Sequence, residues 1–150
     1  VLAFVALVAL ANGLLGVVGG LFGYEELSFQ MVLGWVFAPV VWLAGIPWSE
    51  ATQAGSLMGL KTALNEVYAY DQLSRIGGDL SERTRLIMTY ALCGFANFSS
   101  VGILTGGLVA IAPSRREDIL QLAPRALISG TLATLMTGAA VGVLPSGLFG

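Results

Sequence analysis

Histidine is absent from this chain of 150 residues, and cysteine occurs only once, at position 93. Without histidine, the chain lacks the commonest metal ligand and the side chain that most often transfers protons near neutral pH. A single cysteine excludes a disulfide within the chain and a zinc site built from several cysteines. Because the neighbours of Cys93 are apolar, we expect its thiol to be buried and unreactive. Catalysis by histidine and zinc binding by cysteines are therefore not expected.

Charge is also scarce. Charged residues make up 11% of the chain and hydrophobic residues 56%, and the mean hydropathy is +0.83. The formal net charge is −2, and no basic cluster marks a surface for nucleic acid. This composition predicts a protein that lies in membrane lipid. The chain begins with Val1 and enters directly into an apolar helical pattern, so we expect a fragment of a longer membrane protein without a signal peptide here.

The order of apolar runs and breaks predicts an all-α membrane protein made of five segments that form one domain lacking its N-terminal part. Residues 1–23 are uncharged, long enough to cross the hydrocarbon core, and rich in glycines spaced for contact with another helix. The other segments are an interfacial or tilted helix (24–48), a re-entrant helical hairpin (49–80), a discontinuous transmembrane helix (81–113) and a final transmembrane helix (114–150).

Two of these segments depart from plain membrane helices. The sequence from Ala51 to Tyr70 is too polar for lipid and too apolar for a solvated loop. It predicts two short helices, Ser49–Lys61 and Asn65–Ser74, that flank residues 62–64. Within segment 81–113, the apolar stretch from Thr84 to Ala112 is too long for one straight span, and Gly94–Ser100, with its polar residues, is predicted to break it. Helix N-caps are predicted at Ser28, Ser49 and Ser81, and a capping box at Ser114 and Glu117.

Glu66 is the strongest candidate for a binding role. An ionisable group at membrane depth is costly, so it should face a cavity and have partners. A carboxylate only accepts hydrogen bonds, and the vicinal hydroxyls of a sugar are matching donors. The alternative is a structural ion pair with Lys61, which lies five residues earlier. That spacing is poor within a regular helix, although a broken hairpin tip would allow it.

Polar residues near the predicted break are further candidates. Asn97 offers a donor and an acceptor, and Ser100 a hydroxyl on the same face of a helix, so that with Glu66 they could bind a polyhydroxylated ligand. The alternative is hydrogen bonding between helices. Phe95 could stack on a planar ring or belong to the core. Asn65 either lines the same site or ties down the tip of the hairpin.

Residues 59–70 (Gly-Leu-Lys-Thr-Ala-Leu-Asn-Glu-Val-Tyr-Ala-Tyr) resemble the signature of the concentrative nucleoside transporters. That signature reads Gly/Ala-x-Lys-x-x-x-Asn-Glu-Phe-Val-Ala and ends on an aromatic or similar residue. This chain differs in carrying Val67-Tyr68 where the family has Phe-Val, which exchanges the order of a large aromatic and a β-branched residue. Residues 95–100 (Phe-Ala-Asn-Phe-Ser-Ser) resemble the second substrate-lining motif of that family.

The resemblance implies a secondary active transporter, not an enzyme, that couples nucleoside uptake to a cation gradient, usually of sodium. It places ribose contacts on Glu66, Asn97 and Ser100 and the ring-facing aromatic on Phe95. The principal sodium ligands of the family lie on an earlier hairpin and helix, so we expect them outside this chain, which would be the C-terminal part of a bacterial member. The family forms multi-pass homotrimers, here expected in the bacterial inner (plasma) membrane, with residues 1–23 in the central scaffold.

Two hypotheses from other classes remain at this point. A membrane-embedded enzyme would use Glu66 as a base, but the chain offers no histidine and no second carboxylate at membrane depth. A purely structural membrane subunit would use Asn97 and Ser100 as hydrogen-bonding contacts between helices.

Overall fold

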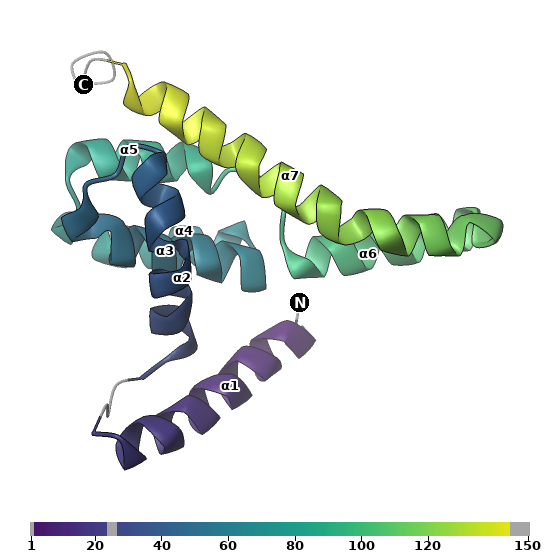
Figure 1. Cartoon of the computed structure of the whole chain (residues 1–150), viewed down its shortest axis with the longest axis horizontal. Coiled ribbons are helices and arrows are strands. Elements are labelled where there is room, and N and C mark those ends of the chain that lie inside the picture. The colour runs from purple at the N-terminus through teal and green to yellow at the C-terminus, as the bar shows by residue number, and fades with distance from the viewer. Residues whose placement is uncertain (1, 24–26, 145–150) are drawn as a thin grey trace.

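The computed structural model describes residues 2–23 and 27–144, and this part of the chain contains helices and connecting loops without strands (Figure 1). This agrees with the predicted all-α class. The elements in chain order are α1 (Leu2–Leu21), α2 (Phe29–Leu43), α3 (Trp48–Ala63), α4 (Glu66–Ile76), the 3₁₀ turn η1 (Gly77–Asp79), α5 (Glu82–Ala91), α6 (Phe98–Ile111), the 3₁₀ turn η2 (Pro113–Arg115) and α7 (Arg116–Gly142).

The first helix lies apart from the other helices (Figure 1). It contacts α2, where Oδ1 of Asn12 accepts a hydrogen bond from the backbone N–H of Phe29 at 2.7 Å. A Cβ added at Gly13, Gly16 or Gly20 would meet no atom within 4 Å. Within the described residues, these three positions of the predicted contact face are therefore uncovered, whereas its fourth glycine, Gly19, is buried.

Helices α2 and α3 form the most extensive helix–helix contact of the described structure, and the chain bends by 117° between them. They approach closely where Gly34 on α2 faces Gly55 on α3. A Cβ at position 55 would lie 2.5 Å from the carbonyl oxygen of Gly34 and 2.8 Å from the backbone nitrogen of Ala38. Since side chains cannot fit at such distances, glycine at this crossing is what permits the close approach.

Two helix starts follow the local sequence as predicted. Oγ of Ser28 accepts from the N–H of Met31 at 3.2 Å, and Oγ of Ser81 accepts from the N–H of Thr84 at 3.3 Å. The carboxylate of Glu50, in the first turn of α3, accepts from the N–H and the hydroxyl of Ser81 at 3.3 and 2.9 Å. The cap of α5 thus also joins α5 to α3.

Two predicted caps are wrong. Ser49 lies inside α3, because the helix is preceded by the extended backbone of Pro47, which supplies no side-chain cap. Ser114 and Glu117 do not form a capping box. The backbone from Pro113 forms the tighter turn η2, which includes Ser114, and α7 begins after it without a side-chain cap. In both cases a proline moved the helix start away from the serine.

Helices α5 and α6 run antiparallel to α7, with residues 92–97 non-helical between them. Towards the C-terminal end of α7, a Cβ at Gly138 would lie 2.8 Å from the carbonyl oxygen of Ile87. Closer to the start of α7, a Cβ at Gly130 would lie 3.1 Å from Cβ of Ala96 in the 92–97 link. The interruption overlaps the break that the sequence predicted at residues 94–100, although residues 98–100 already belong to α6. Its interpretation as a break within one membrane span remains a prediction.

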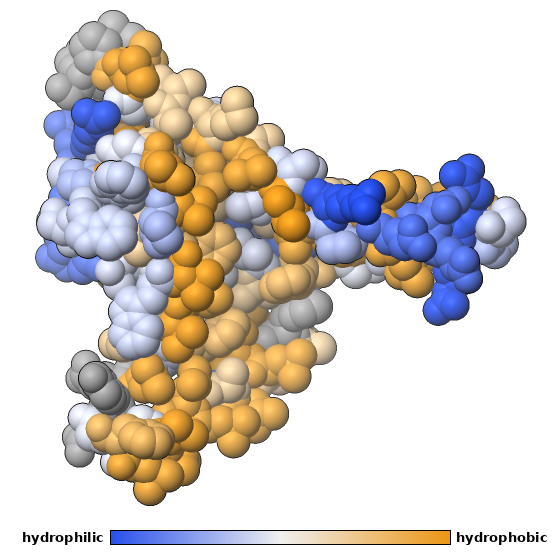
Figure 2. All heavy atoms as spheres, in the orientation of Figure 1, coloured by the Kyte–Doolittle hydropathy of each residue, from blue (hydrophilic) through white to orange (hydrophobic). Residues whose placement is uncertain are grey.

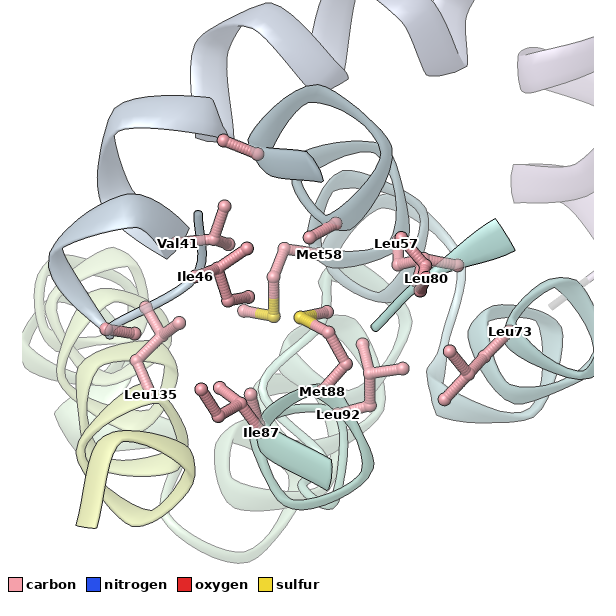
Figure 3. Close-up of a cluster of buried hydrophobic side chains, with 14 of the residues drawn as sticks. Val41, Ile46, Leu57, Met58, Leu73, Leu80, Ile87, Met88, Leu92 and Leu135 are labelled. Carbon is pink, nitrogen blue, oxygen red and sulfur yellow. The ribbon is translucent and has the colours of Figure 1, made fainter. Parts of the chain in front are cut away.

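The hydrophobic core lies where α2, α3, α5 and α7 meet (Figure 3). Met58 and Met88 lie at its centre and are fully buried. Full burial of one such side chain stabilises the fold by about 1.5–3 kcal/mol. The surrounding side chains labelled in Figure 3 are Val41, Ile46, Leu57, Leu73, Leu80, Ile87, Leu92 and Leu135.

The surface is largely apolar, as expected for a protein in lipid. Hydrophobic residues cover much of the face in Figure 2, and hydrophilic residues gather at the end where α6 leads into α7 and on the side of α5. In the described part of the chain, Pro113–Gly142 is long and apolar enough to cross a membrane, and little of it is buried. The bent pair α2 and α3 meets the same test when taken together.

Candidate functional site

The first part of the site is the start of α4. Leu64 ends α3 with non-helical dihedral angles, and Asn65 is extended. Oδ1 of Asn65 accepts from the N–H groups of Val67 and Tyr68 at 3.0 and 3.3 Å, which makes Asn65 the N-cap of α4. Of the two roles considered for Asn65, the structure thus assigns its amide oxygen to holding the chain at the α3–α4 corner. Glu66, the first residue of α4, is half-buried.

The second part is the start of α6. Asn97 is extended and only 1% exposed, and its Oδ1 accepts from the N–H of Ser100 at 2.8 Å. The amide oxygen of Asn97 therefore caps α6, while its amide nitrogen points to another element. Nδ2 of Asn97 donates to Oε2 of Glu66 at 3.5 Å. This contact joins residues that lie 31 positions apart in the chain.

The starts of α4 and α6 thus meet through Glu66 and Asn97. Both helix N-termini carry partial positive charge, which favours a carboxylate placed beside them. The pairing also places the Glu66 carboxylate, which only accepts hydrogen bonds, beside the Asn97 amide, which can donate. A sugar hydroxyl can donate to the first and accept from the second. The structure brings these two predicted residues together from separate helices.

Phe95 and Ser100 line a cavity of about 510 Å³ between the 92–97 link, α6 and α7. The ring of Phe95 is 76% exposed, so its face is available to a planar group. The cavity is mostly apolar in its lining. The complete set of lining residues is Phe95, Ala96, Ser100, Val101, Leu104, Ala126, Leu127, Gly130 and Thr134. Glu66 and Asn97 are not part of this lining, so the predicted site residues divide into a polar pair and an adjacent apolar wall.

Lys61 does not form the ion pair with Glu66 that was considered as the structural alternative. Within the described residues, the ion pairs shorter than 4.0 Å are Arg75–Asp71 and Arg115–Asp118, both on exposed surfaces. The side chain of Lys61 is fully buried, and its Nζ donates to Oγ1 of Thr134 on α7 at 3.4 Å. The carboxylate of Glu66 is therefore not occupied by its nearest basic neighbour in the sequence.

Thr134 was missed as a site residue. It lines the cavity, accepts from Lys61 and presses its methyl group on the 92–97 link, where a Cβ added at Gly94 would overlap it. The sequence showed Thr134 only as one of several small residues on the last helix, and no spacing signal separates it from the others. Ser99 was also missed, and its Oγ is buried without a hydrogen-bond partner in the described part of the chain.

The prediction that Cys93 is buried is wrong, because its side chain is exposed in the described structure. Helix α5 ends at Ala91, so Cys93 lies in the non-helical link that follows, where apolar neighbours in the sequence do not bury it. No group of three or more His, Cys, Asp or Glu side chains with metal-binding geometry occurs among the described residues. The expectation that sodium ligands lie outside this chain remains a prediction.

Comparison with known proteins places this geometry in a family. A family model described as Na+ dependent nucleoside transporter C-terminus matches residues 1–142. The transporter YutK of Bacillus subtilis is 49% identical over 142 residues, which cover 95% of this chain and 35% of YutK. Human solute carrier family 28 member 3 is 41% identical over 160 residues (97% and 23%), and the rat sodium/nucleoside cotransporter 1 is 39% identical over 158 residues (95% and 24%).

Solved structures agree with the sequence comparison. CNTnw in an inward-facing substrate-bound state is 46% identical, with a TM-score of 0.86 over 94% of this chain and 35% of that one. A CNTnw variant in an outward-facing state gives a TM-score of 0.88 at 45% identity, over 99% of this chain and 37% of that one. The chain thus spans about a third or less of the length of these relatives. A match over residues 1–142 nevertheless covers nearly all of it, and the chain therefore belongs to the family of Na+-dependent nucleoside transporter C-terminal regions.

Proposed function

We propose that this chain forms the C-terminal part of a secondary active transporter that takes up nucleosides across the plasma membrane. The uptake is driven by a cation gradient, for which we propose sodium. The observation that carries the proposal is the contact between Glu66 and Asn97 at the meeting helix starts of α4 and α6. Relatives named as sodium/nucleoside cotransporters support the substrate class and the coupling ion.

The polar pair suits the sugar of a nucleoside. The Glu66 carboxylate accepts hydrogen bonds from two vicinal hydroxyls, and the Nδ2 group of Asn97 donates to a hydroxyl oxygen. Such bonds to a charged acceptor contribute about 1.5–3 kcal/mol each when water is excluded. Ser100 supplies a further hydroxyl, and Phe95 an exposed ring on which the base stacks. Asn65 contributes indirectly, because its cap fixes the backbone that presents Glu66.

The proposed transport cycle uses the two interruptions of the helical pattern. Residues 49–80 act as a re-entrant hairpin with its tip at the α3–α4 corner, and residues 81–113 as a discontinuous membrane helix with residues 92–97 as its break. Irregular backbone at membrane depth is tolerated where it lines a cavity, and discontinuous helices of this kind carry the binding sites of many transporters. The hairpin and the broken helix move relative to a fixed scaffold to give alternating access. Sodium ligands are supplied by other parts of the transporter.

The proposed assembly is a multi-pass homotrimer in the bacterial inner membrane. Helix α1 belongs to its central scaffold, and its uncovered glycine positions are suited to close helix contact. The apolar surface seen in Figure 2 faces lipid or the remaining parts of the transporter.

Uptake of labelled uridine tests this function. The transporter that contains this chain is placed in proteoliposomes, and initial rates are measured with an inward sodium gradient and with choline in place of sodium. We expect sodium-dependent uptake, and a loss of at least tenfold in kcat/KM on Glu66→Gln or Asn97→Ala. The matched control is Glu82→Gln, an exposed carboxylate in the first turn of α5, which should retain full uptake.

The outcomes separate the remaining hypotheses. If the wild-type protein shows no nucleoside uptake under any cation gradient, the transport proposal is wrong. Full uptake in both site variants would show that the site is elsewhere. Loss of the purified oligomer in these variants, without a specific change in KM, would favour the structural role for Asn97 and Ser100. The enzyme hypothesis finds no support among the relatives, which are named as transporters.

A further inference from the structure

Lys61 carries a buried charge that the proposed binding reaction does not use. It is the basic residue in the last turn of α3, and its side chain has no exposed surface. Burying an ammonium group is costly unless an opposite charge or several hydrogen bonds compensate it. Within the described residues, the ammonium group donates to Oγ1 of Thr134, at the long distance of 3.4 Å. A neutral hydroxyl at this distance compensates only a small part of that cost.

Glu66 lies five positions after Lys61 in the chain and is the acidic group considered as its partner. The two residues lie on opposite sides of the α3–α4 corner, where Leu64 and Asn65 turn the chain. Their charged atoms are nonetheless more than 4.0 Å apart, since the pair is absent from the ion pairs of the described structure. Opposite charges in a medium of low dielectric constant attract each other well beyond contact distance. Each of the two can therefore compensate the other without a direct bond.

The position of Lys61 is held from a third element. Thr134 lies on α7. Its hydroxyl accepts a hydrogen bond from Nζ of Lys61 and donates one to the carbonyl of Thr131 at 3.0 Å. Its methyl group lies against the backbone of Gly94. The ammonium group is thus tied towards α7, on the side of the 92–97 link.

We propose that Lys61 is a positioning residue for the nucleoside site: its buried ammonium group balances the charge of Glu66 without bonding to it. Within the described residues, the carboxylate is then contacted by the amide of Asn97 and not by a cation, which leaves acceptor capacity for the hydroxyls of the ligand. A direct ion pair would balance the charge equally well. It would also occupy the acceptors that the ligand needs, and binding would then have to break it. This inference rests on the proposed function. It adds a reason why the ammonium group of Lys61 lies close to the nucleoside site without taking part in it.

A double-mutant cycle tests the charge balance. Lys61→Met leaves the carboxylate uncompensated, Glu66→Gln leaves the ammonium group uncompensated, and the double variant removes both charges. The midpoint of thermal unfolding, Tm, is measured for the purified transporter without ligand. We expect each single variant to lower Tm by about 5 °C or more, and the double variant to have a higher Tm than either. Additive losses, with the double variant the least stable, would overturn the proposal.

Transport kinetics test the positioning role. Lys61→Met should raise KM for uridine about tenfold with a smaller change in the maximal rate, and Lys61→Arg, which keeps the charge, should stay within about threefold of the wild type. Thr137→Val is the matched control, because Thr137 is exposed on the same helix and its hydroxyl donates to the carbonyl of Ala133, so the variant leaves Lys61 and the cavity lining unchanged. If Lys61→Arg raises KM as much as Lys61→Met does, Lys61 serves only the local contact with α7 and the proposal is wrong.

The two parts of the experiment distinguish this inference from the proposed function. Absence of uridine uptake by the wild-type transporter contradicts the proposed function, and the thermal cycle still decides whether the charges are coupled. If wild-type uptake is sodium-dependent and the Tm losses are additive, the proposed function holds and the role of Lys61 fails. Where Lys61→Met does not yield folded protein, the comparison of Lys61→Arg and the double variant with Glu66→Gln gives the same decision.

Discussion

The crossing of α2 and α3 at Gly55 makes a quantitative prediction for a single added methyl group. In Gly55→Ala, the new Cβ would lie 2.5 Å from the carbonyl oxygen of Gly34, 2.8 Å from the nitrogen of Ala38 and 3.1 Å from the carbonyl carbon of Phe37. All three atoms belong to the backbone of α2, so no side-chain rotation relieves the overlap. The two helices would have to separate by roughly 1 Å, and a gap of that size forfeits a quarter to a half of the dispersion energy across the contact.

Two opposing effects set the size of the change. Alanine favours a helix over glycine by about 1 kcal/mol, which stabilises the variant. Overpacking in a core costs about 1–3 kcal/mol, and here the clash with backbone on three sides places the cost at or above the upper end. The separation would also loosen the core contacts of Val41 and Met58, which are fully buried beside this crossing. We expect a net loss of about 2 kcal/mol.

Thermal unfolding of the purified transporter in detergent measures this loss. The shift in Tm is about 2–4 °C per kcal/mol for 150–250 residues and falls with size, so for a transporter about three times as long as this chain Tm should fall by about 2–4 °C. The matched control is Gly106→Ala on α6, where a Cβ meets no atom within 4 Å of the described structure. That variant should keep or slightly raise Tm, because only the helix propensity changes. Equal Tm values for Gly55→Ala and the wild type would refute the close approach of α2 and α3.

Three further substitutions have defined outcomes. Asn97→Ala removes the N-cap of α6 and the amide that reaches Glu66, so stability should fall by about 1 kcal/mol and KM for uridine should rise about tenfold; an unchanged KM would exclude Asn97 from the site. Asn65→Ala should cost about 1 kcal/mol in thermal stability, whereas Asn65→Ser, which can still cap α4, should retain most of it; equal losses would contradict the capping role. Asn12→Ala removes the hydrogen bond to Phe29 and should lower Tm while KM stays at the wild-type value, and a raised KM would show that α1 shapes the site.

The candidate residues could be identified from local sequence chemistry, which acts over a few neighbouring residues. Asn65 and Asn97 each precede a helical pattern, and each was found capping that helix. The contact between Glu66 and Asn97 was expected only in the sense that both should face one ligand. Its geometry depends on how α4 and α6 are packed, and hydrophobic periodicity does not encode that packing. The binding of a nucleoside by these residues is still a prediction, which the uptake experiment tests.

Sequence reasoning failed where a distant element decides the outcome. The alternative partner proposed for Glu66 was Lys61, because the two are close in the chain, yet the side chain of Lys61 is directed to Thr134, which lies 73 residues later. Cys93 was expected in the core because its neighbours are apolar, yet the turn after α5 exposes it. A local pattern contains neither the direction of a side chain after a break nor the identity of the element packed against it.

By itself, the sequence determined the membrane class, the all-α fold, the caps at Ser28 and Ser81 and the two places where helices are interrupted. These features depend on composition and on hydrogen bonds between residues at most a few positions apart, so they can be recognised without knowledge of the packing. The tertiary structure alone decided the close crossing of α2 and α3, the antiparallel course of α5 and α6 along α7, and the burial of Lys61 against α7. Those features arise from contacts between residues far apart in the chain, where many pairings satisfy the same apolar pattern and only close packing selects one of them.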